Sequence, residues 1–267
     1  MRPITDTEFA RFQQFIFEQA GITLSSAKQA LVSGRLGKRL TAHQLESFGD
    51  YFQMLASGQH PDEVQAAVDL LTTNETYFFR ETKHFDFLRQ QALLARQRGS
   101  NFRVWSAASS SGEEAYSVAM VLADCLEGGP WEILGTDIST HVLQQATRAL
   151  YSMERARHVP SEFLRRYCLK GEGDYAGRLL IVPELRRRVR FGQLNLNEAL
   201  PEIGSFDFVL LRNVMIYFND DTKRSVVQRV SSVLKPGGHF CVGHSETLNN
   251  LGHRLEQVAP SIYRRPS

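Results

Sequence analysis

The sequence predicts an α/β protein made of a small all-helical N-terminal domain and a second domain built on a parallel sheet. Apolar residues follow helical spacing, without strand-like alternation, over about the first eighty residues. From Asn101, short apolar runs alternate with helical segments, as in βαβ units. A glycine-rich stretch at 167–182 breaks this rhythm and predicts an inserted antiparallel hairpin. We place the two domains at 1–82 and 83–267, with the inserted β-subdomain at 162–192.

The composition indicates a globular chain. Of its 267 residues, 42% are hydrophobic and 22% charged, which excludes a disordered, collagen-like or coiled-coil protein. The formal charge of +2 is too small to indicate a nucleic-acid or membrane partner. Cys125, Cys168 and Cys241 are odd in number and fit no metal-ligand spacing, so we expect a reducing compartment and no metal site. No apolar run reaches the roughly 20 residues of a membrane span, and we expect a cytoplasmic protein.

The helical domain has recognisable caps and connections. Apolar residues at helical spacing form three runs: Phe9, Phe12 and Ile16; Leu31, Leu36 and Leu40; Val64, Val68 and Leu71. Expected N-caps are Thr5 or Asp6, Ser25 or Ser26, and Ser47. Gly21 and the cluster at 57–61 mark the connections between helices.

The second domain contains four predicted parallel strands. These are Phe102–Ala107, Glu132–Thr136, Phe206–Leu211 and His239–Gly243. Helices are expected at Glu113–Leu126, His141–Leu150 and Asp220–Leu234. We assign a further strand, Arg187–Gly192, to the antiparallel insertion.

The loop after the first strand indicates a ligand site. Small residues run from Ser106 to Gly112, which lets the backbone approach a ligand closely. The dinucleotide glycine fingerprint is missing, and Glu113 and Glu114 stand at the helix N-terminus, where they repel phosphate. A ligand with hydroxyls and a positive charge but no phosphate fits this loop, and S-adenosylmethionine is such a ligand. The alternative is an ordinary serine-rich turn with acids that favour the helix dipole.

Polar residues at the ends of two further strands extend this site. Asp137 stands where an acid accepts hydrogen bonds from ribose hydroxyls, although it would also serve as an N-cap. Arg212 follows the third strand, with Tyr217 shortly after it, and an ion pair and a core aromatic are the plainer readings of these two. Residues 72–80 concentrate hydroxyls, an amide and a guanidinium, which favours a lid over a linker.

Five motifs together resemble one family. They are TNETYFFR (73–80), WSAASSSGEEAYS (105–117), RNVMIYF (212–218), LKPGG (234–238) and GHSE (243–246). Their ordered set closely resembles the CheR family, the chemotaxis-receptor glutamate O-methyltransferases. The resemblance spans nearly the whole chain and implies a class I S-adenosylmethionine methyltransferase domain of Rossmann-like fold. One departure is Ala115, where the family commonly has proline.

The resemblance implies a role for individual residues. S-adenosyl-L-methionine is the implied cofactor and S-adenosyl-L-homocysteine its product. Residues matching the family's cofactor contacts are Asn74, Thr76, Arg80, Glu114, Asp137, Asn195, Leu196, Arg212 and Asn213. Within this set Arg80 lies near the methionine carboxylate, and Tyr217 matches the aromatic beside the transferred methyl, so these two are the implied catalytic residues. A glutamate substrate is already ionised at neutral pH, so no general base is needed. The histidines, His84 and His244 among them, are scattered and form no nucleophile–His–Asp constellation, and we interpret His244 as a structural loop residue.

The implied partners are the cytoplasmic helical region of chemoreceptors and a receptor C-terminal peptide, with receptor adaptation as the outcome. Candidate receptor-binding cations are Lys28, Arg35, Lys38 and Arg39, for which a solvated helix face is the alternative. Candidate tail-binding residues are Gly171, Gly173, Gly177 and Arg178, assisted by Arg186 to Arg188. In this reading the peptide pairs with an edge strand, whereas the alternative is a purely structural hairpin. Rival functions are an S-adenosylmethionine-binding sensor module and a methyltransferase acting on another substrate.

Overall fold

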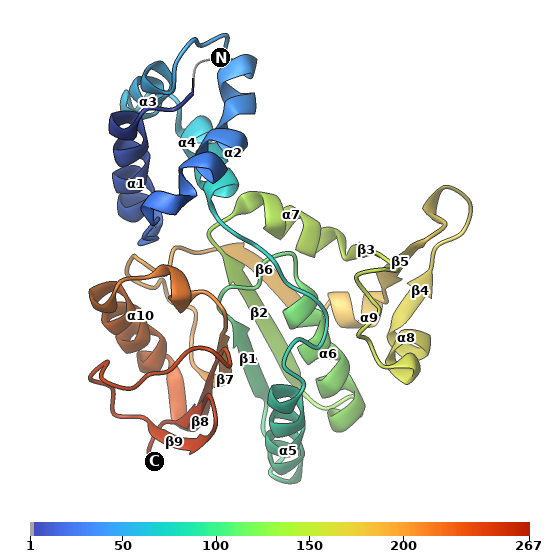
Figure 1. Ribbon diagram of the computed structural model, residues 1–267. Coiled ribbons are helices and arrows are strands. Elements are labelled where there is room, and N and C mark those ends of the chain that lie inside the picture. Colours follow the sequence, from blue (N-terminus) through green and yellow to red (C-terminus); the bar gives the residue numbers. More distant parts are fainter. Residues whose placement is uncertain (1–2) are drawn as a thin grey trace.

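The computed structural model describes residues 3–267, so the first two residues of the predicted helical domain lie outside it. Four helices form the N-terminal domain (Figure 1): α1 (Asp6–Ala20), α2 (Gln29–Ala42), α3 (Phe48–Ala56) and α4 (Pro61–Leu71). Phe12 lies at the centre of their core, stacked on Tyr51 at 6.2 Å between ring centroids and edge-on to Phe48 at 6.4 Å. The predicted all-helical character is confirmed.

Two of the three predicted caps form as expected. Thr5 and Glu8 make a capping box, in which Thr5 N donates to Glu8 Oε2 at 2.9 Å and Glu8 N donates to Thr5 Oγ1 at 3.3 Å. Ser47 Oγ accepts a hydrogen bond from Asp50 N at 3.1 Å. Before α2 a 3₁₀ turn intervenes, and Ser25 makes no side-chain cap bond there.

The second domain is a seven-stranded sheet with helices on both faces (Figure 1). Its strands, in spatial order, are β6 (Val189–Gln193), β2 (Trp131–Asp137), β1 (Phe102–Ser106), β7 (Phe206–Leu211), β8 (Leu234–Val242), β10 (Ile262–Arg264) and β9 (Glu256–Ala259). The main helices are α5 (Lys83–Gln97), α6 (Glu113–Leu126), α7 (Thr140–Arg148) and α10 (Asp220–Ser232). The first five strands pair in parallel, and β10 is antiparallel to β8.

Alternating side chains of the central strands point to opposite faces of the sheet and pack into two separate cores. On one face Phe208 and Leu210 of β7 pack with α5 and α6, and on the other face Val209 and Leu211 pack with α10 and with the helical domain. The strand order reverses between β1 and β7, because β2 follows β1 on one side and β7 lies on the other. Open α/β sheets bind ligands at this switch point, beyond the carboxyl ends of the strands.

Two parts of the strand assignment need correction. The sheet does not end at the predicted strand 239–243, since the hairpin β9–β10 adds two further strands. β9 is short and three of its four residues are exposed, so it lacks the apolar alternation that marks a strand. Also, β8 begins at Leu234 and includes the predicted turn at 235–238, with an irregular register against β7.

The inserted sheet differs from the prediction at both ends. It has the order β3-β5-β4, formed by β3 (Leu150–Ser152), β5 (Arg178–Ile181) and β4 (Cys168–Lys170), all antiparallel. β3 lies before the predicted start at 162. The strand predicted at Arg187–Gly192 is β6, which pairs in parallel with β2 and therefore belongs to the large sheet. The connecting helices are α8 (Ser161–Tyr167) and α9 (Pro183–Arg186).

The two domains are joined by backbone and side-chain hydrogen bonds. Ile22, after α1, forms a bridge with Phe218, and Thr23 N donates to the carbonyl of Tyr217 at 2.8 Å. On the other side, the Asp69 carboxylate of α4 accepts hydrogen bonds from Thr140 N at 3.0 Å and Thr140 Oγ1 at 2.9 Å. Within the described part of the chain, no helix combines the length and apolar character needed to cross a bilayer.

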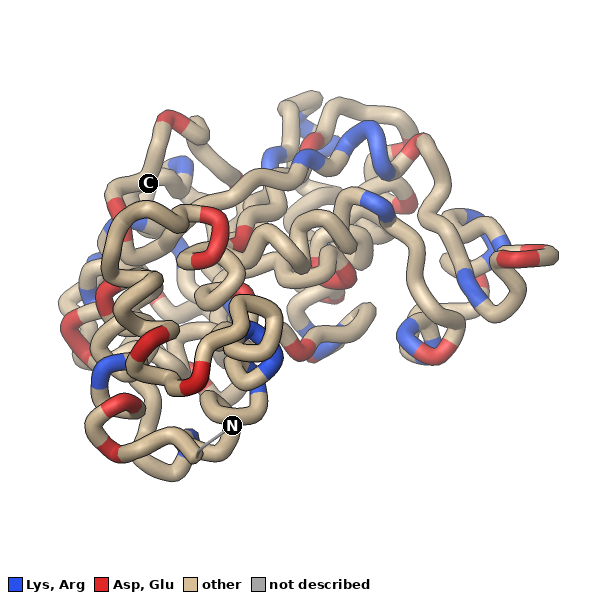
Figure 2. Tube along the Cα trace, turned by 90° about the horizontal axis from the view of Figure 1, so that it is seen from above, with Lys and Arg blue, Asp and Glu red and all other residues tan. Residues whose placement is uncertain are grey.

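A buried carboxylate holds the helical domain together. Glu63 Oε1 accepts hydrogen bonds from the Tyr51 hydroxyl and from Arg39 Nε, both at 2.7 Å, and His43 Nε2 lies 2.9 Å from Oε2. Burial raises the pKa of Glu63, but these donors outweigh it and hold the pKa at about 2. Acidic and basic residues are interspersed over this domain (Figure 2), and Glu63 and Arg39 form a pair within it.

Replacing Glu63→Gln is expected to lower the free energy of unfolding at pH 7 by about 2 kcal/mol, because charged hydrogen bonds are lost. The folded pKa is about 2 and the ordinary value 4.5, so this stabilisation is complete above pH 4.5 and is lost as the pH falls towards 2. Urea titrations of both proteins at several pH values should therefore converge in acid. Exposed Glu46→Gln is the matched control, and a difference that stays constant with pH contradicts the assignment.

Candidate active site

One pocket lies between the two domains, beyond the carboxyl ends of β1, β2 and β7. All ten residues predicted for cofactor binding and catalysis line it: Asn74, Thr76, Arg80, Glu114, Asp137, Asn195, Leu196, Arg212, Asn213 and Tyr217. Five separate stretches of sequence supply them. The sequence missed the apolar wall that the helical domain contributes through Ala20 and Ile22, because amphipathic spacing does not reveal contacts between domains.

The segment predicted as a lid is anchored at several points. Arg35 of α2 donates from Nη1 to the carbonyl of Thr72 at 2.9 Å, which fixes the start of the segment. Ser110 Oγ donates to the carbonyl of Asn74 at 2.7 Å, which ties it to the loop after β1. Phe79 has a φ of +56°, so the chain bends sharply just before Arg80. These bonds hold residues 72–80 against the pocket.

The loop between β1 and α6 depends on one glycine. Gly112 has a φ of +94°, and a Cβ there would lie 2.9 Å from the Tyr151 hydroxyl and 2.8 Å from the Ala146 Cβ. Only glycine fits this position without strain. The turn brings Ser110 N within 2.9 Å of Asp137 Oδ2, and this bond links the ends of β1 and β2.

The two acids of α6 are both neutralised. Glu114 accepts hydrogen bonds from Ser106 Oγ on Oε1 and from Arg212 Nη1 on Oε2, each at 2.7 Å. Glu113 is fully buried, forms an ion pair with Arg155, and lies outside the pocket lining. The expectation that two free acids repel phosphate is therefore wrong in detail, since only Glu114 reaches the pocket and its charge is compensated.

Asp137 is held in place by the backbone. Its Oδ1 accepts a hydrogen bond from Ser139 N at 3.0 Å and its Oδ2 accepts one from Ser110 N. The N-cap of α7 is Ser139, so the N-cap alternative for Asp137 is not realised. Burial raises the pKa of its carboxyl. Each oxygen keeps a second lone pair, so Asp137 has acceptor capacity for hydroxyl groups of a bound ligand.

Arg212 joins three segments of the chain. Its side chain is 2% exposed and donates to Glu114 Oε2 at 2.7 Å, to Glu81 Oε2 at 3.0 Å and to the carbonyl of Arg80. Burial opposes its charge, but the two carboxylates outweigh this effect and raise the pKa of Arg212. Arg212 is therefore an ion-pair partner, as the alternative interpretation of the sequence states, and it also lines the pocket.

Arg80 and Tyr217 keep polar atoms available. Arg80 Nη1 donates to the carbonyl of Glu75 at 3.2 Å, and its guanidinium lies 5.8 Å from the ring centroid of Tyr77. Most of its five donors are thus uncommitted to the protein. Tyr217 is half-buried, and its backbone carbonyl is fixed by Thr23 N.

Asn195 and Leu196, both predicted as cofactor contacts, lie side by side at the pocket. Asn195 Nδ2 donates to the carbonyl of Gln19 and to Glu198 Oε1, each at 2.8 Å. Its side chain thereby fixes the end of α1 at the pocket rim. Leu196 is buried beside it and contributes apolar surface.

The four predicted receptor-binding cations separate into two pairs. Lys28 and Lys38 are exposed. Arg35 donates to backbone carbonyls and Arg39 pairs with Glu63 of α4, so both serve the domain itself. Residues 25–45 contain these four cations and no acid, so the sequence of the segment does not reveal Glu63, which lies on another helix.

A shallow groove lies on the inserted sheet and includes Gly171. A Cβ at Gly171 would lie 2.0 Å from the carbonyl of Tyr175, so the hairpin needs glycine there. Cations line the groove at Arg148, Lys170 and Arg186. Other predicted tail-binding residues lie outside its lining: Gly173, Gly177 and Arg178 in the hairpin, and Arg188, which donates to the carbonyl of Gly129 at 2.8 Å.

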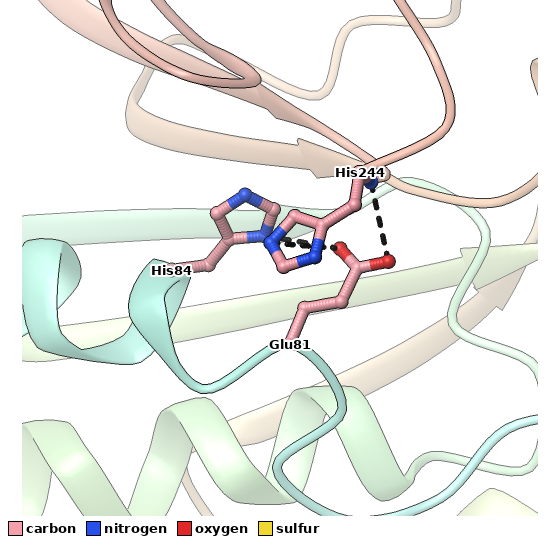
Figure 3. Close-up of side chains that lie close together, drawn as sticks. All are labelled: Glu81, His84 and His244. Carbon is pink, nitrogen blue, oxygen red and sulfur yellow. Dashed lines mark hydrogen bonds and ion pairs between the residues drawn. The ribbon is translucent and has the colours of Figure 1, made fainter.

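Two histidines regarded as scattered are neighbours in space. His84 and His244 have ring centroids 5.0 Å apart, and the Glu81 carboxylate lies close to both rings (Figure 3). Sequence spacing gives no sign of this cluster, because Glu81 and His244 are 163 positions apart.

Comparison with known families agrees with this architecture. The family described as "CheR methyltransferase, all-alpha domain" matches residues 7–72, and "CheR methyltransferase, SAM binding domain" matches residues 74–263. The chain belongs to the CheR methyltransferase family. It therefore has the class I methyltransferase fold and uses S-adenosylmethionine as its cofactor. The family resemblance seen in the sequence motifs is confirmed.

Curated relatives of this CheR-family chain cover nearly its full length. A "Chemotaxis protein methyltransferase" of Escherichia coli (strain K12) is 40% identical over 263 residues, which are 97% of this chain and 91% of that protein. A "Chemotaxis protein methyltransferase 2" of Pseudomonas aeruginosa is 39% identical over 262 residues, 97% of this chain and 93% of that protein.

The Arg212 network should carry a large share of the stability of this CheR-family protein. Arg212→Met is expected to lower the free energy of unfolding by about 3–5 kcal/mol, because Glu114 is left buried without its charged partner. Arg89→Met is the matched control, since Arg89 pairs with Asp124 but is 41% exposed, and it should cost less than about 1 kcal/mol. Denaturant titrations measure both. Equal losses would show that burial of the pair does not matter.

Proposed function

We propose that this protein transfers the methyl group of S-adenosylmethionine to glutamate side chains in the cytoplasmic helical region of chemoreceptors. The products are glutamyl methyl esters and S-adenosylhomocysteine, and the biological outcome is sensory adaptation in the cytoplasm. The observation that supports this most is the gathering of all ten predicted site residues around one pocket at the sheet's switch point. The names of the curated relatives point the same way.

The pocket lining matches the chemistry of the cofactor. Asp137 has lone pairs for the ribose hydroxyls, and Arg80 has free donors for the amino-acid carboxylate. Leu194, Leu196 and Ile138 offer apolar surface for the adenine ring. When bound, the cofactor supplies an electrophilic methyl group on a sulfonium.

The residues around the pocket suit a reaction without a general base. Among the described residues that line it, there is no histidine and no cysteine. A glutamate substrate with a pKa near 4.3 is ionised at neutral pH and needs no proton removed. Arg80 and Tyr217 are the residues that would orient the reactants and exclude water, so catalysis rests on positioning and desolvation.

Two surfaces would recognise the receptor. Lys28 and Lys38 are the two exposed residues among the four predicted receptor-binding cations, and they would meet a carboxylate-rich receptor helix. The groove on the inserted sheet would take the receptor's C-terminal peptide as an added strand beside β4. Exposed Leu169 and Tyr175 provide apolar contacts there, and the three lining cations would attract the terminal carboxylate.

Methyl transfer with radiolabelled S-adenosylmethionine and receptor-bearing membranes tests the main proposal. The receptor should carry label that mild base releases, as expected for a carboxyl methyl ester. Arg80→Ala and Tyr217→Ala should each reduce the rate by at least about 10²-fold, because misplaced reactants lose the advantage of proximity. Arg80→Ala should also weaken cofactor binding.

The control for these variants is exposed Arg98→Ala, which should leave the rate unchanged. Wild-type rates in both site variants would refute the assigned roles. Cofactor binding without transfer to any receptor would favour a sensor module, and label on a different, base-stable product would favour another substrate.

Peptide titration tests the tail-binding groove separately. A synthetic peptide with an aromatic residue and a free terminal carboxylate should bind the wild-type protein, and Lys170→Glu should weaken binding by about 10-fold because it reverses a lining charge. Amidating the peptide's C-terminus should have a similar effect. If the free and amidated peptides bind equally, or if neither binds, the hairpin has a structural role alone.

A further inference from the structure

Three side chains of the types that bind metal ions lie close together beside the pocket. Glu81 precedes α5, His84 lies in its first turn and His244 follows β8 (Figure 3). Glu81 Oε2 lies 3.4 Å from His84 Nδ1 and 3.9 Å from His244 Nε2, and the three ligand atoms all lie within 4.8 Å of one another. These residues are not part of the pocket lining.

His84 gives this cluster an unusual feature. Its side chain is 1% exposed, and neither ring nitrogen has a hydrogen-bond partner. A buried imidazole that makes no hydrogen bond is costly, because its polar atoms have lost their contact with water. A neutral ring with an uncommitted nitrogen facing a carboxylate is the form in which histidine binds metal ions.

The surrounding charges favour a cation. Glu81 and Glu114 share one guanidinium, that of Arg212. Glu246 adds a third carboxylate, which accepts hydrogen bonds from Gly243 N at 2.7 Å and from Asn213 N at 2.8 Å. The three carboxylates thus outnumber the single guanidinium of Arg212 around the cluster. His244 is exposed and gives an ion access from solvent.

We propose that Glu81, His84 and His244 bind a divalent transition-metal ion, with Zn²⁺ the best match. Two imidazoles and one carboxylate are a set used at zinc sites that keep a fourth position for water. Ligand atoms about 2.0–2.1 Å from a tetrahedral ion are about 3.3 Å apart. Small side-chain movements reach this geometry from the observed separations, and His244 at the surface has room to make them.

Zinc titration of tag-free protein by calorimetry, with Co²⁺ absorption as a second probe, tests the site. The wild type should bind a single Zn²⁺ per chain, and Co²⁺ should give the strong visible bands of tetrahedral coordination. His244→Ala should weaken binding by at least about 10-fold, because one of the direct ligands is lost. Exposed His60→Ala is the control and should bind as the wild type does.

His84→Leu and Glu81→Gln extend the test to the buried ligands, after thermal melting has shown that each variant folds. His244→Ala decides the matter if either of them does not fold, because its side chain lies at the surface. Absence of binding, or equal affinity in wild type and His244→Ala, overturns the proposal. The measurement involves no methyl transfer, so its failure leaves the proposed function untouched.

Discussion

The buried guanidinium of Arg212 is the interaction on which the site depends. Its side chain binds Glu114 on the helix after β1, and it binds Glu81 and the carbonyl of Arg80 in the segment between the two domains. Arg212 itself directly follows β7. Removing a charge of this kind from water is costly unless partners surround it. Glu114 and Arg80 line the pocket, and Glu81 directly follows Arg80 in the chain. The network therefore fixes the relative positions of three segments before any ligand arrives.

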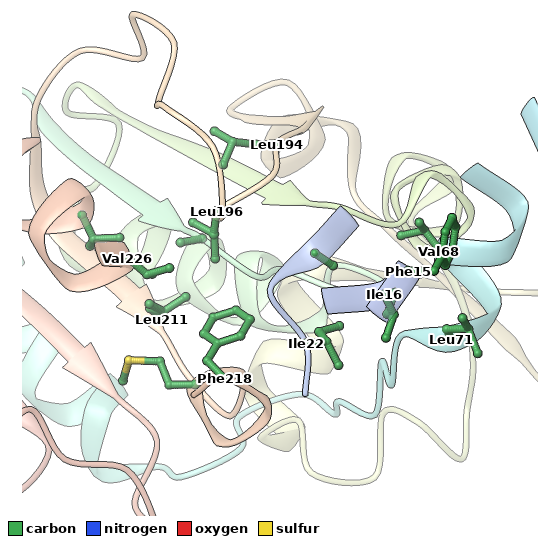
Figure 4. Close-up of a cluster of buried hydrophobic side chains, with 14 of the residues drawn as sticks. Phe15, Ile16, Ile22, Val68, Leu71, Leu194, Leu196, Leu211, Phe218 and Val226 are labelled. Carbon is green, nitrogen blue, oxygen red and sulfur yellow. The ribbon is translucent and has the colours of Figure 1, made fainter. Parts of the chain in front are cut away.

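The helical domain completes the pocket as well as covering it. A continuous apolar cluster crosses the boundary between domains (Figure 4). Ile22 and Phe15 lie on one side of the boundary and Phe218 and Leu196 on the other. Because the pocket takes residues from both domains, separating them would open it to solvent. Ligand binding should therefore stabilise the docked arrangement, since a ligand that binds the folded form alone shifts the equilibrium towards it.

Local patterns in the sequence predicted the parts of the fold that are formed by local interactions. The helical domain, the strands β1, β2 and β7 and the loop at Ser106–Gly112 follow from periodicity, caps and small residues. Pairing between distant strands does not leave such a pattern, so the sequence places β6 in the wrong sheet and does not reveal the hairpin β9–β10, whose first strand is largely exposed. Asp137, Asn195 and Arg212 line the same pocket because the carboxyl ends of parallel strands meet at one edge of the sheet. The partners of Glu113, Arg39 and His84 lie on other elements, so their ion pairs and contacts could not be foreseen.

The distribution of charge in the pocket explains why it suits a nucleoside that carries an amino acid better than one that carries phosphates. Glu114 is compensated by Arg212, whereas Asp137 is held by backbone donors and faces the pocket without a cationic partner among the described residues. In the segment between the domains, most N–H donors of the Arg80 guanidinium make no hydrogen bond to the described residues. A ligand with hydroxyls near Asp137 and a carboxylate near Arg80 satisfies both groups. A pyrophosphate beside Asp137 would meet an uncompensated buried acid, which a low-dielectric pocket makes strongly unfavourable.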